Sequence, residues 1–226
     1  MAEGLSAAEV GKEIAHHRDH AERDLVLGIV EAVLLSLVAL LAAWSGYSAA
    51  KWSTHSSISL ATASATRAKA GVTEIQAIQI RTLDSVSFNA VATAYASGDK
   101  KLFAVTLRRL RPGYRTAMNA WLALHPLTNP RAPPGPSYMP QYRIPQEARY
   151  RALNVKAAAY LDEGESAAHR ADEYVRLTVL LAAVLFLIGI GSRFPVRAAR
   201  LGLVAVAGLL LVISLVQLLA LPGPPS

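Results

Sequence analysis

The chain has 226 residues, of which 53% are apolar and 17% are charged, with a formal net charge of +7 and no cysteine. This apolar excess excludes an ordinary soluble domain. It is concentrated in three stretches, and helix-forming residues dominate elsewhere, so the sequence predicts an all-α membrane protein with three transmembrane helices. The lack of cysteine does not identify a compartment, because an exported domain can do without disulfides.

Residues 1–24 are predicted to form a cytoplasmic amphipathic helix. Their six acids and three Lys/Arg are the wrong charge for the start of a cleaved signal peptide. Four side chains of metal-ligand type recur here at +4, +7 and +11, along one stripe of a helix. The segment lacks the ligand spacing of a zinc motif, so we expect no bound metal or cofactor. Weak candidates for metal binding or pH sensing are Glu13, His17, His20 and Asp24.

Residues 25–45 are predicted to be the first transmembrane helix. Twenty residues at a rise of 1.5 Å cover about 30 Å, which is one hydrocarbon core. The single charge in this stretch is Glu31. An ionisable group at membrane depth is a candidate member of an ion pathway. The competing interpretation is a structural glutamate near the cytoplasmic interface, for which the other spans offer only Arg176 and Arg193 as cations.

The stretch WSGYSAAKW follows the first span. Trp44, Tyr47, Lys51 and Trp52 lie at +3, +7 and +8, which we interpret as one helix face of anchors at the lipid headgroups. The small residues between them leave a slim opposite face where another helix can approach.

Residues 46–173 are predicted to be an extracytoplasmic helical domain. Proline is absent from Tyr47 to Tyr95, so we expect the first span to continue as one helix for about fifty residues. Small residues at 53–71 favour either an oligomer contact or a low-volume face within the chain. Larger apolar residues then recur every three to five positions and predict a packed helix face. These residues are Val72, Ile75, Ile78, Leu83, Val86 and Val91.

Two short helices and a proline-rich segment are expected next. A turn at 96–101 precedes one helix, Pro112 and Gly113 interrupt it, and a second helix buries Tyr114, Met118, Trp121 and Leu122. Residues 126–145 contain seven of the twelve prolines and predict an extended strap. The arginines of the two helices suggest either a phosphate or lipid-headgroup site or a solvated helix end. They are Arg108, Arg109, Arg111 and Arg115.

The remaining chain is predicted to cross the membrane twice. A helix from residue 146 enters the second span, 174–192, a cytoplasmic basic turn covers 193–200, the third span is 201–221, and the tail is 222–226. Arg193, Arg197 and Arg200 make this turn basic without an acid. By the positive-inside rule the turn and the N-terminus are cytoplasmic, and 46–173 is extracytoplasmic.

No catalytic triad, phosphate loop, dinucleotide fingerprint or carboxylate pair is recognisable, so we expect a protein that is not an enzyme. The basic charge is predicted to lie outside the cytoplasm, where anionic lipids or envelope polymers are more plausible partners than nucleic acid.

Three stretches together resemble a known family. They are EAVLLSLVALLAAWSGYSAAKW, LRPGYRTAMNAWLALHPLTNPRAPPGPSYMPQY and the GSRF turn. They are similar to uncharacterised three-span bacterial inner-membrane proteins with a W-x-G-Y-x-A-x-x-W segment after the first span. The resemblance covers most of the chain from Glu31 onward. It implies a plasma-membrane location and this topology, and no activity.

Three functions follow as hypotheses. The first is a non-enzymatic scaffold in the bilayer that self-associates through its extracytoplasmic helices as a homo-oligomer. The second is an oligomeric channel or transporter subunit that uses Glu31. The third is a sensor with a histidine-bearing cytoplasmic helix.

Overall fold

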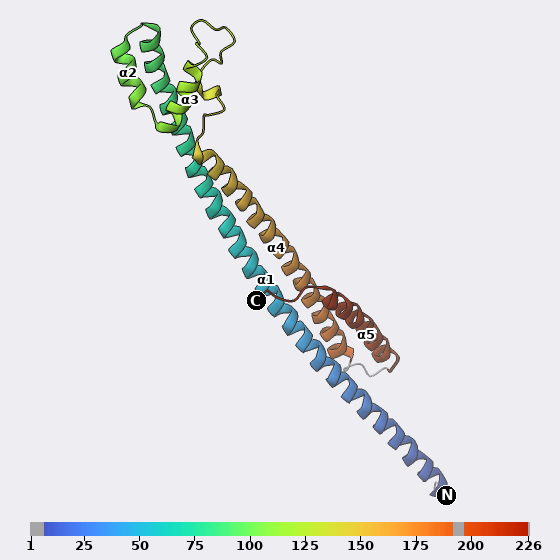
Figure 1. Ribbon diagram of the computed structural model, residues 1–226. Helices are drawn as coiled ribbons and strands as arrows, with labels where there is room; N and C mark the ends of the chain where they lie inside the picture. Colours follow the sequence, from blue (N-terminus) through green and yellow to red (C-terminus); the bar gives the residue numbers. More distant parts are fainter. Residues whose placement is uncertain (1–6, 192–196, 226) are drawn as a thin grey trace. The chain divides into compact units, whose positions relative to one another are not determined.

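The computed structural model describes residues 7–191 and 197–225, with side chains described for 28–191 and 198–225. The described chain is all-α and contains no strand (Figure 1). Its elements are α1 (Ala7–Ala96), α2 (Lys100–Arg109), α3 (Pro112–Leu122), the 3-10 turn η1 (Pro136–Tyr138), α4 (Pro145–Gly191) and α5 (Arg197–Ala220).

The helices form two compact units. The first unit holds the described residues up to Ile58 and those from Glu163 onward, and the second holds Ser59–Asp162. Helices α1 and α4 each contribute a segment to both units. The continuous α1 confirms that the first apolar stretch and the following proline-free segment form one helix.

The first unit contains three apolar helical segments, from α1, α4 and α5. In the described chain, three helices are long and apolar enough to cross a membrane, as predicted. A core cluster joins all three, with Val38 from α1, Leu181, Val184 and Ile188 from α4, and Ala207 from α5. Most other side chains of the three apolar segments are exposed, which suits contact with lipid.

The second unit folds because the segment between α1 and α4, residues 96–145, packs against the end of α1. We call this segment the excursion. Gly98 has a positive φ of 73° in the turn after α1, and the Asp99 carboxylate caps α2 by accepting hydrogen bonds from two backbone N–H groups. Pro112 stands in the first turn of α3, where its missing N–H costs nothing. A buried cluster closes the excursion, as expected for the third helix. It consists of Val91, Leu110, Tyr114, Met118 and Trp121.

The proline-rich segment is a strap held in place by α3 and by the buried cluster. Residues 126–144 contain turns and η1 but no α-helix, as the proline content predicts, and α4 begins at Pro145. The Trp121 indole Nε1 donates a hydrogen bond of 2.7 Å to the Pro133 carbonyl. Met139 and Tyr142 pack against the buried cluster and hold the far end of the strap.

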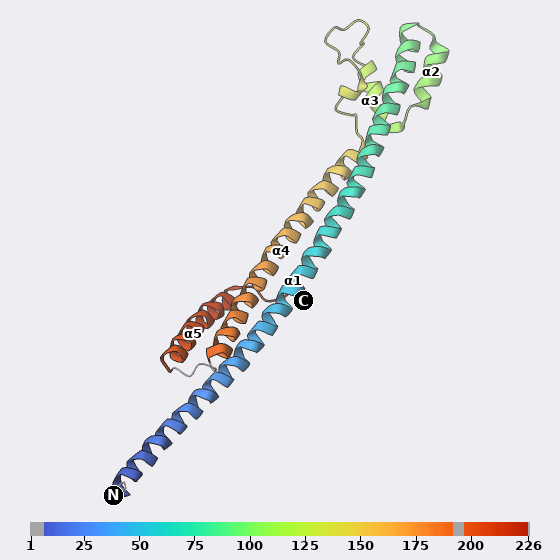
Figure 2. The same ribbon diagram turned by 180° about the vertical axis from the view of Figure 1, so that it is seen from behind.

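The predicted packed face of α1 is wrong in the second unit. Val72, Ile75, Ile78, Leu83 and Val86 are all more than half exposed, and only Val91 of that set is buried. Small residues lie inward instead, because they let α4 approach α1 closely (Figure 2). The inward residues include Ala63, Thr66, Ala70, Thr73 and Ala77.

Candidate functional site

The most polar contact among the apolar segments of the first unit joins Glu31 of α1 to Arg200 of α5. The Arg200 Nε and one terminal nitrogen each donate to a different Glu31 oxygen, both over 2.7 Å. The Glu31 side chain is 8% exposed and that of Arg200 is 22% exposed. This bidentate geometry is the strongest way to neutralise a carboxylate away from water.

The pairing corrects the sequence-based choice of partner. Arg176 and Arg193 were the cations considered for Glu31, and Arg200 was placed in a turn at 193–200. Because α5 begins at Arg197, Arg200 lies within its first turns and can reach α1. The side chains of Arg193 and Arg197 lie outside the described part of the chain, so the orientation inferred from the basic turn stays a prediction.

The four weak metal candidates also lie outside the described side chains. Glu13, His17, His20 and Asp24 belong to α1, but their side chains are not described. Among the residues that are described, no group of three His, Asp or Glu side chains could hold a metal ion. The stripe therefore stays a prediction.

The tryptophan-rich stretch after the first apolar segment divides into two faces. Trp44 and Tyr47 are 51% and 53% exposed. Trp52 is only 6% exposed and packs against Ala167, Ala171 and Tyr174 of α4. Trp52 follows Trp44 by eight residues, which turns it about 80° around the helix. The prediction that all four side chains lie on one lipid-facing side was therefore wrong for Trp52. Lys51 is half-buried. An anchoring role for Trp44, Tyr47 and Lys51 stays a prediction.

Small residues in the same stretch form the slim contact face that the sequence suggested. Ser45 and Ser48 are fully buried, and the Ser45 hydroxyl donates to the Tyr174 carbonyl of α4 over 2.9 Å. The Tyr174 hydroxyl in turn donates to the Pro222 carbonyl over 2.8 Å. The Arg170 guanidinium stacks over the Trp52 ring at 4.6 Å from its centroid. These contacts hold α1, α4 and the C-terminal tail together.

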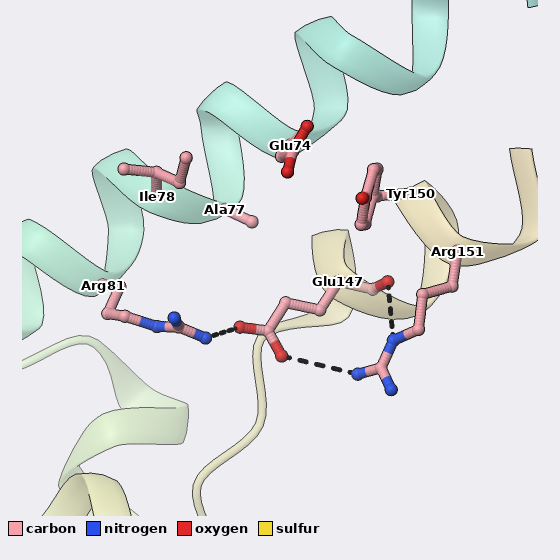
Figure 3. Close-up of a pocket in the computed structure, with 7 residues that line it drawn as sticks. All are labelled: Glu74, Ala77, Ile78, Arg81, Glu147, Tyr150 and Arg151. Atoms are coloured by element: carbon pink, nitrogen blue, oxygen red, sulfur yellow. Dashed lines mark hydrogen bonds and ion pairs between the residues drawn. The ribbon is translucent and has the colours of Figure 1, made fainter. Parts of the chain in front are cut away.

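A charged pocket of about 270 Å³ lies between α1 and α4 in the second unit (Figure 3). Glu147 reaches from α4 to Arg81 of α1 and forms a further ion pair with Arg151 one turn on, at 3.6 Å. Both arginines are more than half exposed, so water screens these pairs and each stabilises the fold only slightly. Glu74 and Tyr150 line the other side of the pocket.

A buried ion pair lies near the strap in the second unit. Two Arg111 nitrogens donate to the two Asp84 oxygens, at 2.7 and 3.4 Å, and the Asp84 side chain is only 5% exposed. Of the four arginines considered for a phosphate site, Arg111 is therefore engaged inside the protein. Arg108, Arg109 and Arg115 are exposed.

Two tyrosines next to this pair have perturbed acidity. Burial raises the pKa of the Tyr114 hydroxyl. Burial, together with the negative charge of Asp84, raises the pKa of Tyr142 from 10.0 to about 12. Both hydroxyls are buried, with Ser137 beside that of Tyr114 and Asp84 beside that of Tyr142. The raised pKa values favour the protonated, neutral form of both tyrosines. We therefore interpret the group of Asp84, Arg111, Tyr114 and Tyr142 as structural.

The outward face of α1 in the second unit is apolar and without a partner in the described chain. Exposed residues recur there at alternating steps of four and three from Ala61 to Gln79, and Leu83 and Val86 follow at steps of four and three. No Lys, Arg, Asp or Glu lies among them. We call this set the outer seam. It comprises Ala61, Ala65, Ala68, Val72, Ile75, Gln79, Leu83 and Val86.

No family model, curated protein or solved structure matches the chain. The resemblance to three-span bacterial membrane proteins remains an expectation from the sequence motifs.

Proposed function

We propose that the chain is a non-enzymatic scaffold of the bacterial plasma membrane that associates with further copies of itself through the extramembrane part of α1. The observation that supports this is the outer seam. Exposed and mostly apolar side chains that recur at steps of three and four residues over about seven turns are typical of a coiled-coil contact.

The seam is compatible with a second copy of the same chain. Three membrane spans would hold all copies in one orientation, so that their α1 helices meet in parallel and at high effective concentration. In a parallel, in-register pair each seam residue except Leu83 meets its own counterpart. No charge lies on the seam, so this arrangement brings no like charges together.

The flanking positions support the same arrangement. Lys69 flanks the seam and would face Ser64 of the second copy rather than another lysine. Gln79 would face Gln79, and an amide both donates and accepts hydrogen bonds. Ile78 and Leu83 of opposite copies would meet and widen the apolar contact.

The alternative of an ion pathway through Glu31 is less favoured by the geometry. Both carboxylate oxygens of Glu31 are engaged by Arg200 within one chain. A group held in this way does not present a free charge to a pore. The sensor hypothesis depends on side chains outside the described residues and gains no support here.

The proposal is tested by cross-linking in membranes. Because the chain has no cysteine, single substitutions provide a clean pair of probes: Ile75→Cys lies on the seam, and Arg67→Cys lies off it, about 80° around α1 from Ile75. A short bis-maleimide should join Ile75→Cys copies and leave Arg67→Cys copies monomeric. A monomer with both probes at native expression levels would contradict self-association.

Charge substitutions give a second readout. Val72→Glu with Val86→Glu should raise the dissociation constant of the oligomer at least about tenfold, since like charges would meet in the contact. The control Arg67→Glu with Ser85→Glu places two acids off the seam, about 120° around the helix from its centre, and makes the chain more negative than the seam variant does. Mass photometry in lipid nanodiscs would measure both, and equal effects would contradict a contact at the seam.

A further inference from the structure

The net charge of the chain is concentrated in the excursion of the second unit. Of the 23 Lys/Arg and 16 Asp/Glu, eight Lys/Arg and a single acid, Asp99, lie in residues 96–145, which leaves fifteen of each elsewhere. Asp99 accepts two hydrogen bonds from the N-terminal N–H groups of α2, and Arg111 is paired with Asp84. The remaining cations make this region an attractive surface for anions.

Helix α2 displays cations and aliphatic side chains together. At about 100° per residue, one outward face of α2 collects five residues without an acid. Leu102 and Val105 are 47% and 39% exposed on this face, although they are aliphatic. The whole face consists of Lys101, Leu102, Val105, Arg108 and Arg109.

The opposite face of α2 fixes this orientation. Phe103 and Leu107 pack against the cluster that contains Val91. The Phe103 ring lies 5.6 Å from the Tyr95 ring, centroid to centroid. The basic and aliphatic face is therefore held outward by the fold of the unit, so it is available to a partner without unfolding.

We propose that this face of α2 binds the surface of an anionic phospholipid bilayer. The arginines and the lysine would pair with headgroup phosphates, while Leu102 and Val105 would enter the boundary between headgroups and acyl chains. A soluble polyanion would use the cations but would gain nothing from the two aliphatic side chains. This inference does not depend on self-association.

The experiment uses the full chain in nanodiscs of neutral phosphatidylcholine. Fluorescent vesicles with about one third phosphatidylglycerol are added, and co-flotation measures their recruitment. Anionic vesicles should be recruited and neutral vesicles should not. Arg108→Gln with Arg109→Gln should weaken recruitment by about thirtyfold, since each cation near an anionic surface contributes about a factor of five.

A matched control separates this face from bulk charge. Arg67→Gln with Arg149→Gln removes the same charge from exposed positions on α1 and α4 and should leave recruitment unchanged. Equal losses in both double variants would overturn the assignment to α2. Recruitment of neutral vesicles to the same extent would overturn it as well.

A second pair of variants distinguishes a bilayer from a polyanion. Leu102→Ser with Val105→Ser should reduce vesicle recruitment severalfold while binding of soluble polyphosphate stays constant. If this variant recruits vesicles as well as the parent chain does, only the cations of the α2 face contribute to binding, and the bilayer proposal fails. Circular dichroism of each variant confirms that α2 and the rest of the chain remain folded.

Discussion

Two buried carboxylate–guanidinium pairs, one in each unit, show how the same chemistry serves two different surroundings. Glu31 and Arg200 form two hydrogen bonds of 2.7 Å between the apolar segments of α1 and α5, where the Glu31 side chain is only 8% exposed. Asp84 and Arg111 form one of 2.7 Å and one of 3.4 Å, beside tyrosines and the Arg143 carbonyl. In the second unit the Arg111 guanidinium also donates a hydrogen bond to the Arg143 carbonyl, so it keeps a polar partner besides the carboxylate.

The Glu31–Arg200 pair fixes the register of its two helices more strictly than the Asp84–Arg111 pair does. Apolar side chains tolerate sliding of one helix along another, but a bidentate pair is satisfied in one position only. The Glu31 pair therefore determines which part of α5 lies against α1. The Asp84 pair ties α1 to the segment between α2 and α3, which Trp121 and the strap also hold in place.

The largest expected effect is that of Glu31→Ala. It leaves the Arg200 guanidinium without this carboxylate in a weakly solvated place, and we expect a loss of about 3–5 kcal/mol in the free energy of unfolding. Reversible unfolding in mixed micelles would measure it. The double variant Glu31→Leu with Arg200→Leu should recover most of this loss. A single variant as stable as the parent chain would contradict a structural pair.

A smaller effect is expected for Asp84→Ala, of about 2 kcal/mol, because Arg111 is partly exposed and retains the Arg143 carbonyl. Hydrogen exchange of the excursion between α1 and α4 would detect the loss locally. Arg81→Ala is the matched control, since it removes an exposed pair between α1 and α4 and should cost less than about 1 kcal/mol. Equal costs would show that burial does not distinguish the two pairs.

The smallest effect concerns Tyr142 and alkaline pH. Its folded pKa is raised to about 12 from an ordinary value of 10.0. Folding thus favours the protonated phenol, so this contribution is fully present below pH 10 and is lost as the pH rises toward 12. Unfolding curves of the full chain between pH 9 and pH 12 should show this decline.

Tyr142→Phe should make the alkaline decline shallower without abolishing it, because the pKa of Tyr114 is also raised. Tyr138→Phe alters an exposed ring and should leave the decline as it is. Identical slopes for the parent chain and Tyr142→Phe would exclude Tyr142 as the source.

The sequence by itself determined the helical class, the three apolar helices and the strap. Each follows from local composition: apolar stretches of spanning length, a long run without proline, and seven prolines within 126–145. The turn at Gly98 and Asp99 and the buried face of α3 are equally local, since turn chemistry and helical periodicity specify them.

Tertiary structure alone decided which face of α1 is buried and which charges meet. Periodicity reports that a helix has an apolar face but not what covers it, and small residues allow the tighter approach, so Ala70 and Ala77 lie inward while Ile75 lies outward. Glu31 and Arg200 are 169 residues apart, and Asp84 and Arg111 are 27 apart. Their pairing depends on the position along α1 at which α5 and the excursion pack. No local pattern in the sequence encodes that position.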